Sequence, residues 1–264
     1  MKRPVLRLAL TVALAAAASA ALGGCGSSSG SGAASTAGGG VHGTIRVFAA
    51  ASLTESFGAL GKEFERQHPG TRVEFSFGAS SDLATQIDNG APADVFASAS
   101  PTNMDQVARA GYAEHPRDFA SNTMEVAVPP ADPAHVHRLA DLARPGVKVA
   151  VCQPQVPCGA VAQEVFHNAG IVVHPVTEEV DVKSVLTKVE AGEVDAGVVY
   201  VTDVRAAGHQ VTGVPVPSGV NATTRYPITV VHGSGNPATA RAFEQLVLAP
   251  QGRQTLAKAG FSRP

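Results

Sequence analysis

The stretch FAAASLTESF, Phe48–Phe57, marks a change from a strand pattern to a helix pattern. The residues TIRVFAA (44–50) are mostly apolar or β-branched, which is typical of a strand, and beyond them apolar residues recur at helical spacing as far as Phe64. Ser52 stands at the junction, and Glu55 follows three residues later in the pattern of a capping box. The chain is therefore predicted to leave a strand and present a helix N-terminus.

A helix N-terminus has unpaired backbone N–H groups and the positive end of the peptide dipole, so it can hold an anion without Lys or Arg. Taken alone, Ser52 is more simply interpreted as a helix cap. The arrangement recurs, however, because the strand pattern TRVEFSF (71–77) leads to Ser80 and Ser81 and then to a helix pattern ending at Gly90. Two such junctions in about thirty residues favour an anion site over a lone cap.

The rest of the chain continues the alternation of strands and helices. Strands are expected at 93–99, 124–130, 147–152, 195–201, 210–216 and 226–231, and helices at 101–111, 138–143, 158–170, 182–190, 237–248 and 251–258. This order predicts the α/β class with parallel sheets. Ligands of such sheets bind where helices begin beyond strand ends, and further helix starts fall at Cys158 and Val182.

Residues 1–25 have the pattern of an export signal, with three basic residues followed by an apolar run. The tetrapeptide LGGC (22–25) resembles a bacterial lipobox, in which Cys25 would carry the lipid. The alternative is a plain signal peptide cut near Ala20 or Ala21. Residues 26–43 are mostly Gly, Ser and Ala, the composition of a flexible linker. A globular body on a lipid anchor is the expected organisation.

The charge and composition argue against nucleic acid as a partner. The chain has 20 basic and 22 acidic residues, no Trp and three Tyr. It therefore lacks both the basic surface and the aromatic platform that nucleic-acid binding needs. We therefore do not expect nucleic acid as a partner.

The remaining cysteines, Cys152 and Cys158, bracket the segment CQPQVPC. In an exported protein such a pair is more often a disulfide than a redox or metal site. The nine His residues show no spacing that predicts a metal site, and we expect His135 and His137, in a polar stretch flanked by Pro, to be solvated. No direct metal ligand is expected.

Five segments together resemble one known family: VFAAASLT (47–54), FGASSDLATQIDNGAPADVFASA (77–99), VPCGAVAQEVF (156–166), VDVKSVL (180–186) and GVVYVTDV (197–204). In that order they are similar to substrate-binding proteins of ABC importers, and among these to the molybdate-binding family, over essentially all of 44–264. The resemblance implies a two-lobed periplasmic-binding-protein fold of type II with two hinge strands. Lobe 1 would comprise 44–122 plus 228–264, and lobe 2 would comprise 123–227. The crossing segments are expected near Ser121–Met124 and Thr224–Pro227.

The resemblance also implies a set of anion contacts. These are the hydroxyl and N–H groups of Ser52 and Ser80, the backbone N–H groups of Cys158 and Val182, and the hydroxyl of Tyr200. Some relatives carry a small residue at the position of Cys158, but a main-chain contact would survive that difference. Asp181 would repel an anion unless its side chain caps the following helix.

Two residues have competing interpretations. A lone Tyr200 would be a core-filling strand residue, and only its position beside the other junctions favours a ligand contact. Asp94 is expected to brace a turn.

The expected ligand is an oxyanion without protons, because its oxygens only accept hydrogen bonds and the hydroxyl and N–H groups of the site can donate them. The function implied is capture of molybdate and tungstate for delivery to the transmembrane subunits of an ABC permease. A monomer is expected, lipid-anchored at the extracytoplasmic face of the cell membrane, with no cofactor and no enzymatic activity. The alternatives are another small oxyanion such as sulfate or thiosulfate, or a secreted hydrolase with Ser52 or Cys158 as nucleophile.

Overall fold

Nine strands and eight α-helices follow one another in the computed structural model, which describes residues 40–264. The predicted signal segment 1–25 with Cys25, and most of the predicted linker 26–43, lie outside the described residues. Within residues 40–264 no helix is long and apolar enough to cross a membrane. The expected mixed α/β class is confirmed.

The first group of elements surrounds the quoted stretch, and its inner strands are parallel because helices connect them. It comprises β1 (Gly43–Ala50), the 3-10 helix η1 (Ala51–Leu53), α1 (Thr54–Gln67), β2 (Thr71–Gly78), α2 (Ser80–Asp88), β3 (Val95–Ala97), α3 (Pro101–Arg109), α7 (Pro237–Leu248) and α8 (Pro250–Ala259). β1 pairs in parallel with β2 on one side and with β3 on the other. The carboxyl ends of these strands therefore meet at one edge.

The second group follows the same rule. It comprises η2 (Leu139–Ala143), β5 (Val149–Cys152), α4 (Pro157–Ala169), β6 (Thr177–Glu179), α5 (Val182–Glu190), β7 (Ala196–Tyr200), α6 (Val201–Ala207), η3 (Gly208–Gln210) and β8 (Thr212–Pro215). β5 is parallel to both β6 and β7. The short elements β6 and α6 were not predicted from the sequence.

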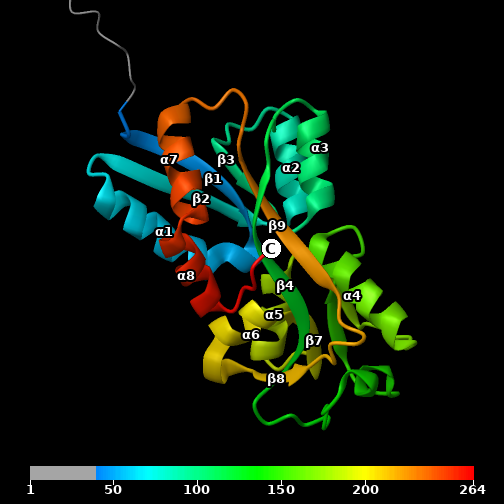
Figure 1. Cartoon of the computed structure of the whole chain (residues 1–264). Helices are drawn as coiled ribbons and strands as arrows, with labels where there is room; N and C mark the ends of the chain where they lie inside the picture. Colours follow the sequence, from blue (N-terminus) through cyan, green and yellow to red (C-terminus); the bar gives the residue numbers. More distant parts are fainter. Residues whose placement is uncertain (1–39) are drawn as a thin grey trace, which may run out of the picture. The chain divides into compact units, whose positions relative to one another are not determined.

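Two strands connect the groups, and both run antiparallel to their neighbours. β4 (Arg117–Val128) pairs with β9 (Thr223–Val230) through its first half and with β7 through its second half. The strand order is β2-β1-β3-β9-β4-β7-β5-β6, with β8 on β4. Figure 1 shows β4 and β9 side by side where the chain passes between the groups.

The sheet is therefore mixed: the expected parallel pairing holds for β2-β1-β3 and for β7-β5-β6, while β4 and β9 pair antiparallel with all their neighbours. The predicted strand 124–130 begins earlier, at Arg117, because tertiary pairing overrides the low strand propensity of Asp118, Ser121 and Asn122. The segments expected to cross do pair with each other, as in the partnership of Asn122 with Thr224.

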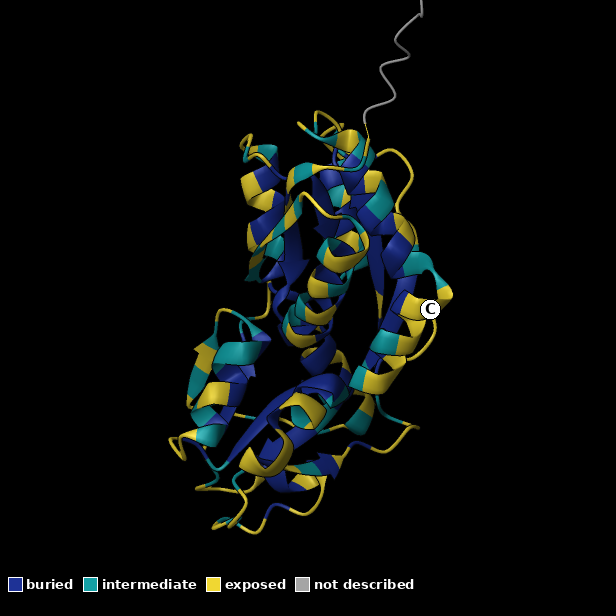
Figure 2. Cartoon of the chain, turned by 90° about the vertical axis from the view of Figure 1, so that its left-hand side faces the viewer, coloured by how far each residue is buried: buried dark blue, intermediate teal, exposed yellow. Residues whose placement is uncertain are grey.

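The buried side chains gather in separate cores. One cluster contains residues from Met124 to Ala222, with only Ala51 and Ala79 from the first group. Two others contain residues up to Ala120 and from Tyr226 onward. Figure 2 shows the burial along the strands and the inner faces of the helices. The lobe boundaries themselves remain a prediction.

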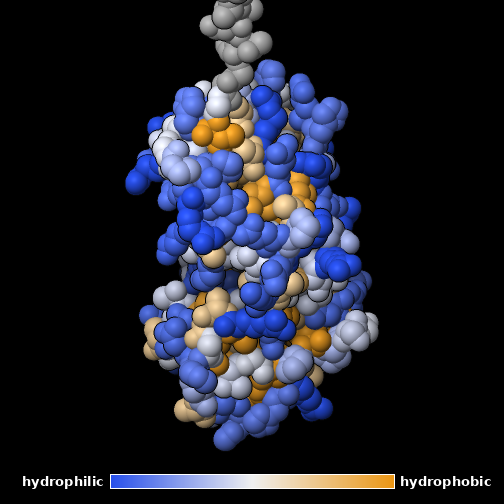
Figure 3. Space-filling model, turned by 60° about the vertical axis from the view of Figure 1, so that its left-hand side comes forward, coloured by the Kyte–Doolittle hydropathy of each residue, from blue (hydrophilic) through white to orange (hydrophobic). Residues whose placement is uncertain are grey.

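The outer surface is mainly hydrophilic on the face shown in Figure 3, with small apolar areas between the polar side chains. Among the described residues, the large hydrophobic side chains classed as exposed are Val172, Val176 and Val180, before and around β6. Scattered apolar residues of this kind are usual on soluble proteins. The surface gives no reason to place the main binding site there.

Candidate functional site

A small cavity lies where the strand ends of the two groups meet. It has a volume of about 20 Å³ and is lined by Ala50, Ala51, Ser52, Gly78, Ala79, Ser80, Ala99, Pro157, Cys158, Asp181, Val182 and Tyr200. All five residues proposed from the sequence as anion contacts are in this set. We call Ser52 and Ser80 the first wall, and Cys158, Val182 and Tyr200 the second wall.

Ser80 is the first residue of α2 and is only 1% exposed. Its Oγ accepts a hydrogen bond of 2.9 Å from the backbone N–H of Ala99. A hydroxyl has one proton to donate besides its acceptor sites. Because the Ala99 contact uses an acceptor site, the Ser80 proton is left for a ligand.

Ser52 does not cap α1, contrary to the sequence pattern. It lies in the 3-10 turn η1, and α1 begins after it, with Leu53 at the N-cap position and no side-chain cap. Its Oγ is instead 2.9 Å from the hydroxyl of Tyr226, which is fully buried. The long-range hydrogen bond with Tyr226 takes the place of the local capping box, which propensity alone could not foresee.

The orientation of that hydrogen bond matters for the ligand. Burial raises the pKa of Tyr226, so its hydroxyl keeps its proton at neutral pH. If Tyr226 donates to Ser52, the Ser52 proton is free to point into the cavity. The first wall then presents two neutral hydroxyl donors.

Cys158 is held at the start of α4 by covalent and steric constraints. It forms a disulfide with Cys152 at the end of β5, so the pair suggested by the sequence is bonded in the structure. A Cβ on the next residue, Gly159, would lie 1.9 Å from the carbonyl oxygen of Gln153. Only glycine therefore allows this close approach. Pro157 has no N–H, and the Gly159 N–H donates to the carbonyl of Val156 at 3.1 Å, so the N–H of Cys158 is the first-turn donor of α4 that lacks an acceptor within the helix.

Val182 is the first residue of α5. The N-cap residue is Asp181, whose Oδ1 accepts a 2.9 Å hydrogen bond from the backbone N–H of Ser184. The carboxylate of Asp181 thus caps α5, which is the condition stated above for an anion to bind in the cavity beside it. The N–H of Val182 has no acceptor within the helix.

Tyr200 supplies the one side chain of the second wall that can donate. It ends β7 and is 1% exposed. Within residues 40–264 its hydroxyl makes no hydrogen bond of ordinary geometry, although the hydroxyl of Tyr226 lies near enough to raise its pKa. Burial raises the pKa of Tyr200 well above its usual value, so the group is a neutral donor. A buried hydroxyl left unpaired costs about 1–3 kcal/mol, which a ligand oxygen would recover.

An ion network behind the second wall was missed by the sequence reading. Asp203, in the first turn of α6, is fully buried and accepts a hydrogen bond of 3.1 Å from the Tyr200 N–H. Its Oδ1 lies 3.2 Å from Lys183 Nζ, which also contacts the carboxylate of Glu55 at 2.8 and 3.0 Å. Lys183 therefore joins α5 and α6 to α1. Lys183 follows Val182 directly in the sequence and Asp203 lies three residues after Tyr200, so both stood close to residues already singled out. The network was missed because the sequence did not predict α6.

Burial and charge act in opposite directions on this network. Burial raises the pKa of Asp203 to about 6, although Lys183 lowers it in part. For Lys183, burial lowers the pKa, but Asp203 and Glu55 together outweigh that effect and raise it. The lysine stays charged and the aspartate titrates within reach of neutral pH.

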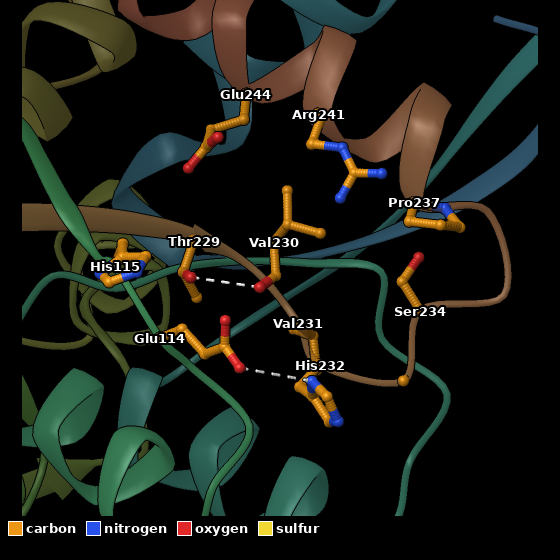
Figure 4. Close-up of a pocket in the computed structure, with 11 residues that line it drawn as sticks. Glu114, His115, Thr229, Val230, Val231, His232, Ser234, Pro237, Arg241 and Glu244 are labelled. Atoms are coloured by element: carbon orange, nitrogen blue, oxygen red, sulfur yellow. Dashed lines mark hydrogen bonds and ion pairs between the residues drawn. The ribbon is translucent and has the colours of Figure 1, made fainter. Parts of the chain in front are cut away.

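A larger cavity of about 350 Å³ lies elsewhere, between β9, the start of α7 and the segment before β4. Figure 4 shows its side chains, including Glu114, His232 and Arg241. It contains charges of both signs, with His232 Nδ1 3.8 Å from a Glu114 oxygen. None of the anion contacts proposed from the sequence lines it. Asp94, outside both cavities, accepts a 2.7 Å hydrogen bond from the Arg46 N–H and so braces the fold, as expected.

Comparison with known proteins assigns the chain to a family. Residues 45–262 match the model of the bacterial extracellular solute-binding proteins. The chain belongs to this family. A Mycobacterium tuberculosis protein named molybdate-binding protein ModA is 45% identical over 222 residues, covering 84% of this chain and 85% of the relative. The Escherichia coli protein of the same name is 32% identical, covering 83% and 89%. The resemblance predicted from the sequence is confirmed.

Solved structures show the same fold. The periplasmic molybdate-binding protein of Azotobacter vinelandii superposes with a TM-score of 0.75 at 22% identity, covering 83% of this chain and 99% of that one. The sulfate-binding protein SubI of M. tuberculosis gives 0.74 at 20% identity, covering 84% and 87%. The expected periplasmic-binding-protein fold is therefore confirmed, and at these identities the likeness concerns the fold alone.

Proposed function

We propose that this protein captures molybdate outside the cytoplasm and delivers it to the transmembrane subunits of an ABC permease, and that it binds tungstate alike. The proposal is supported by the family and by relatives named as molybdate-binding proteins, one of them 45% identical. In this role it binds and releases its ligand without transforming it.

The observation that carries the proposal is the unpaired hydroxyl of Tyr200 in the small cavity. Ser52, Ser80 and the backbone N–H groups of Cys158 and Val182 line the same space, so the cavity offers mainly donors. A tetrahedral dianion without protons accepts hydrogen bonds through every oxygen and would satisfy them together. The five residues proposed from the sequence are accordingly our proposed contacts.

The character of the cavity supports a compact, fully ionised ligand. Of the described residues that line it, none is Lys or Arg, and the one carboxylate, Asp181, is engaged as a helix cap. An anion that still carries a proton would find few acceptors for it. The small volume favours an inorganic oxyanion over a larger phosphorylated metabolite.

We further propose that the protein acts as a monomer held at the membrane by a lipid on Cys25. This rests on the LGGC tetrapeptide and the Gly/Ser-rich segment after it. Sulfate is the principal alternative ligand, because it is also a tetrahedral dianion at neutral pH.

A thermal titration of the purified protein tests the ligand. Molybdate and tungstate at about 1,000 times their Kd would stabilise the folded state by about 4 kcal/mol. We expect sulfate to act weakly, because it is smaller, and phosphate to act weakly, because it retains a proton. Equal shifts with sulfate and molybdate would overturn the selectivity, and no shift with any anion would overturn the site.

A further inference from the structure

Three potential metal ligands meet in the loop between β4 and η2, away from the anion cavity. The side chains are those of Asp132, His135 and His137, and one ligand atom from each lies within 4.8 Å of the others. His137 Nδ1 is 3.5 Å from Asp132 Oδ2. Both histidines are exposed, as the sequence predicted. The turn of the loop also brings Asp132 to them, which the His-X-His spacing alone did not predict.

The backbone that carries these side chains is well fixed. Val136, between the two histidines, is fully buried in the core of the second group. Its N–H donates to Asp132 Oδ1 at 2.9 Å, and the N–H of His137 donates to Asp141 Oδ2 at 2.9 Å. The carbonyl of His135 accepts a 3.0 Å hydrogen bond from Arg144. The two imidazoles therefore leave the chain from a fixed frame.

The carboxylate of Asp132 is divided between two tasks. One oxygen holds the Val136 N–H, and the other faces His137. Orientation of a ligating group by a second hydrogen bond is usual around bound metals. Asp132 and His135 also have positive φ values of 37° and 53°, which side-chain-bearing residues seldom adopt. The loop thus keeps an uncommon backbone shape that brings the three groups together.

The donor set selects a class of ion. Two imidazole nitrogens and one carboxylate oxygen suit zinc, nickel or copper, whereas Ca²⁺ and Mg²⁺ prefer sets made of oxygens. In a tetrahedral zinc site with bonds of about 2.0–2.1 Å, neighbouring ligand atoms are roughly 3.3 Å apart. The 3.5 Å between His137 and Asp132 is already close to this separation.

Nearby arginines do not oppose a cation strongly, because Asp141 neutralises them in part. Arg138 Nε lies 3.3 Å from Asp141 Oδ1, and Arg144 Nε lies 4.0 Å from the same oxygen. The guanidinium groups of Arg138 and Arg144 thus lie close to the Asp141 carboxylate.

We propose that Asp132, His135 and His137 form a binding site for a divalent transition-metal ion of the zinc, nickel and copper class, with water completing the coordination. The site is independent of the proposed oxyanion function. It shares no residue with the anion cavity.

Calorimetric titration of untagged full-length protein with zinc chloride tests the proposal, with calcium chloride as the comparison ion. We expect one zinc per chain and no comparable calcium binding. His137→Ala and Asp132→Asn would each weaken zinc binding at least about tenfold. The matched controls His174→Ala and His209→Ala alter exposed histidines outside the cluster and would leave it unchanged.

Two results would overturn the proposal: no zinc binding by the parent protein, or equal binding by the parent and the His135→Ala/His137→Ala double variant. Melting curves in the presence of a chelator would verify that the variants fold. Molybdate titration of the double variant is expected to match the parent, since the sites are separate.

Discussion

The two walls of the proposed anion cavity are built from different chemical groups. The first wall uses the side-chain hydroxyls of Ser52 and Ser80, each fixed by a neutral hydrogen bond to the interior. The second wall uses backbone N–H groups at two helix starts and the single hydroxyl of Tyr200, with a disulfide and the Lys183 ion network behind them. Substitution of side chains should therefore affect anion affinity most on the first wall. On the second wall, affinity should depend more on the backbone positions of the two helix starts.

The largest effect is expected from Ser52→Ala combined with Ser80→Ala. Each removes a donor to a charged ligand, so the pair is expected to weaken molybdate binding by about 3–4 kcal/mol, several hundredfold. Calorimetry measures it, with Ser81→Ala as the matched control on the same helix. By contrast, Val182→Ala retains its N–H and is expected to bind normally. Similar losses from both walls would contradict the distinction.

The pH dependence of stability tests the ion network. The pKa of Asp203 is raised to about 6 on folding, so between about pH 4 and 6 the folded state holds a proton that the unfolded state has released. Protonation of Asp203 therefore adds to the free energy of unfolding below about pH 4. This stabilisation, up to about 3 kcal/mol, is lost as the pH rises through 6.

We expect Asp203→Asn to remove this fall, while Asp105→Asn, at an exposed site, keeps it. Urea unfolding at pH 4, 5, 6 and 7 provides the comparison. Parallel pH curves for the parent and Asp203→Asn would show that Asp203 does not titrate in the folded protein as described.

The disulfide separates stability from affinity on the second wall. Replacing Cys152 and Cys158 with Ser removes the constraint on a short loop and is expected to lower the free energy of unfolding by about 2 kcal/mol. Because the proposed contact of Cys158 is its N–H, affinity is expected to change less than about threefold. Chemical unfolding and calorimetry on the same sample measure both. A tenfold loss of affinity at unchanged stability would contradict the main-chain role.

The smallest effect concerns Tyr200→Phe, which removes one donor and keeps the ring. Binding is expected to weaken by about 1–2 kcal/mol, or five- to thirtyfold. Without ligand, stability is expected to stay equal or rise, because the lost hydroxyl is unpaired in the interior. Tyr112→Phe, at a partly exposed tyrosine, is the control. A fall in unliganded stability would mean that the hydroxyl serves the fold instead of the ligand.

The sequence predicted the order of most elements because helices and strands here have clear periodicity and sharp Gly, Pro and Ser boundaries. It failed where tertiary contacts override local preference. Ser52 matched a capping box but pairs with Tyr226, and β4 extends through polar residues that only its partner β9 holds in a strand. The ion network was missed for the same reason, since Lys183 and Glu55 are 128 positions apart.

The sequence by itself determined the α/β alternation and the helix starts at or next to Ser80, Cys158 and Val182. These follow from local chemistry, since capping, turns and periodicity depend on neighbours in the chain. The set of residues expected to contact an anion came from the resemblance of five segments to a known family. Only the tertiary structure decided that the residues share one cavity, that the Ser80 hydroxyl accepts from Ala99 and so keeps its proton for a ligand, and that Asp181 is engaged as a cap. Those depend on contacts between segments far apart in the sequence, where burial sets both the hydrogen-bond partners and the protonation of each group.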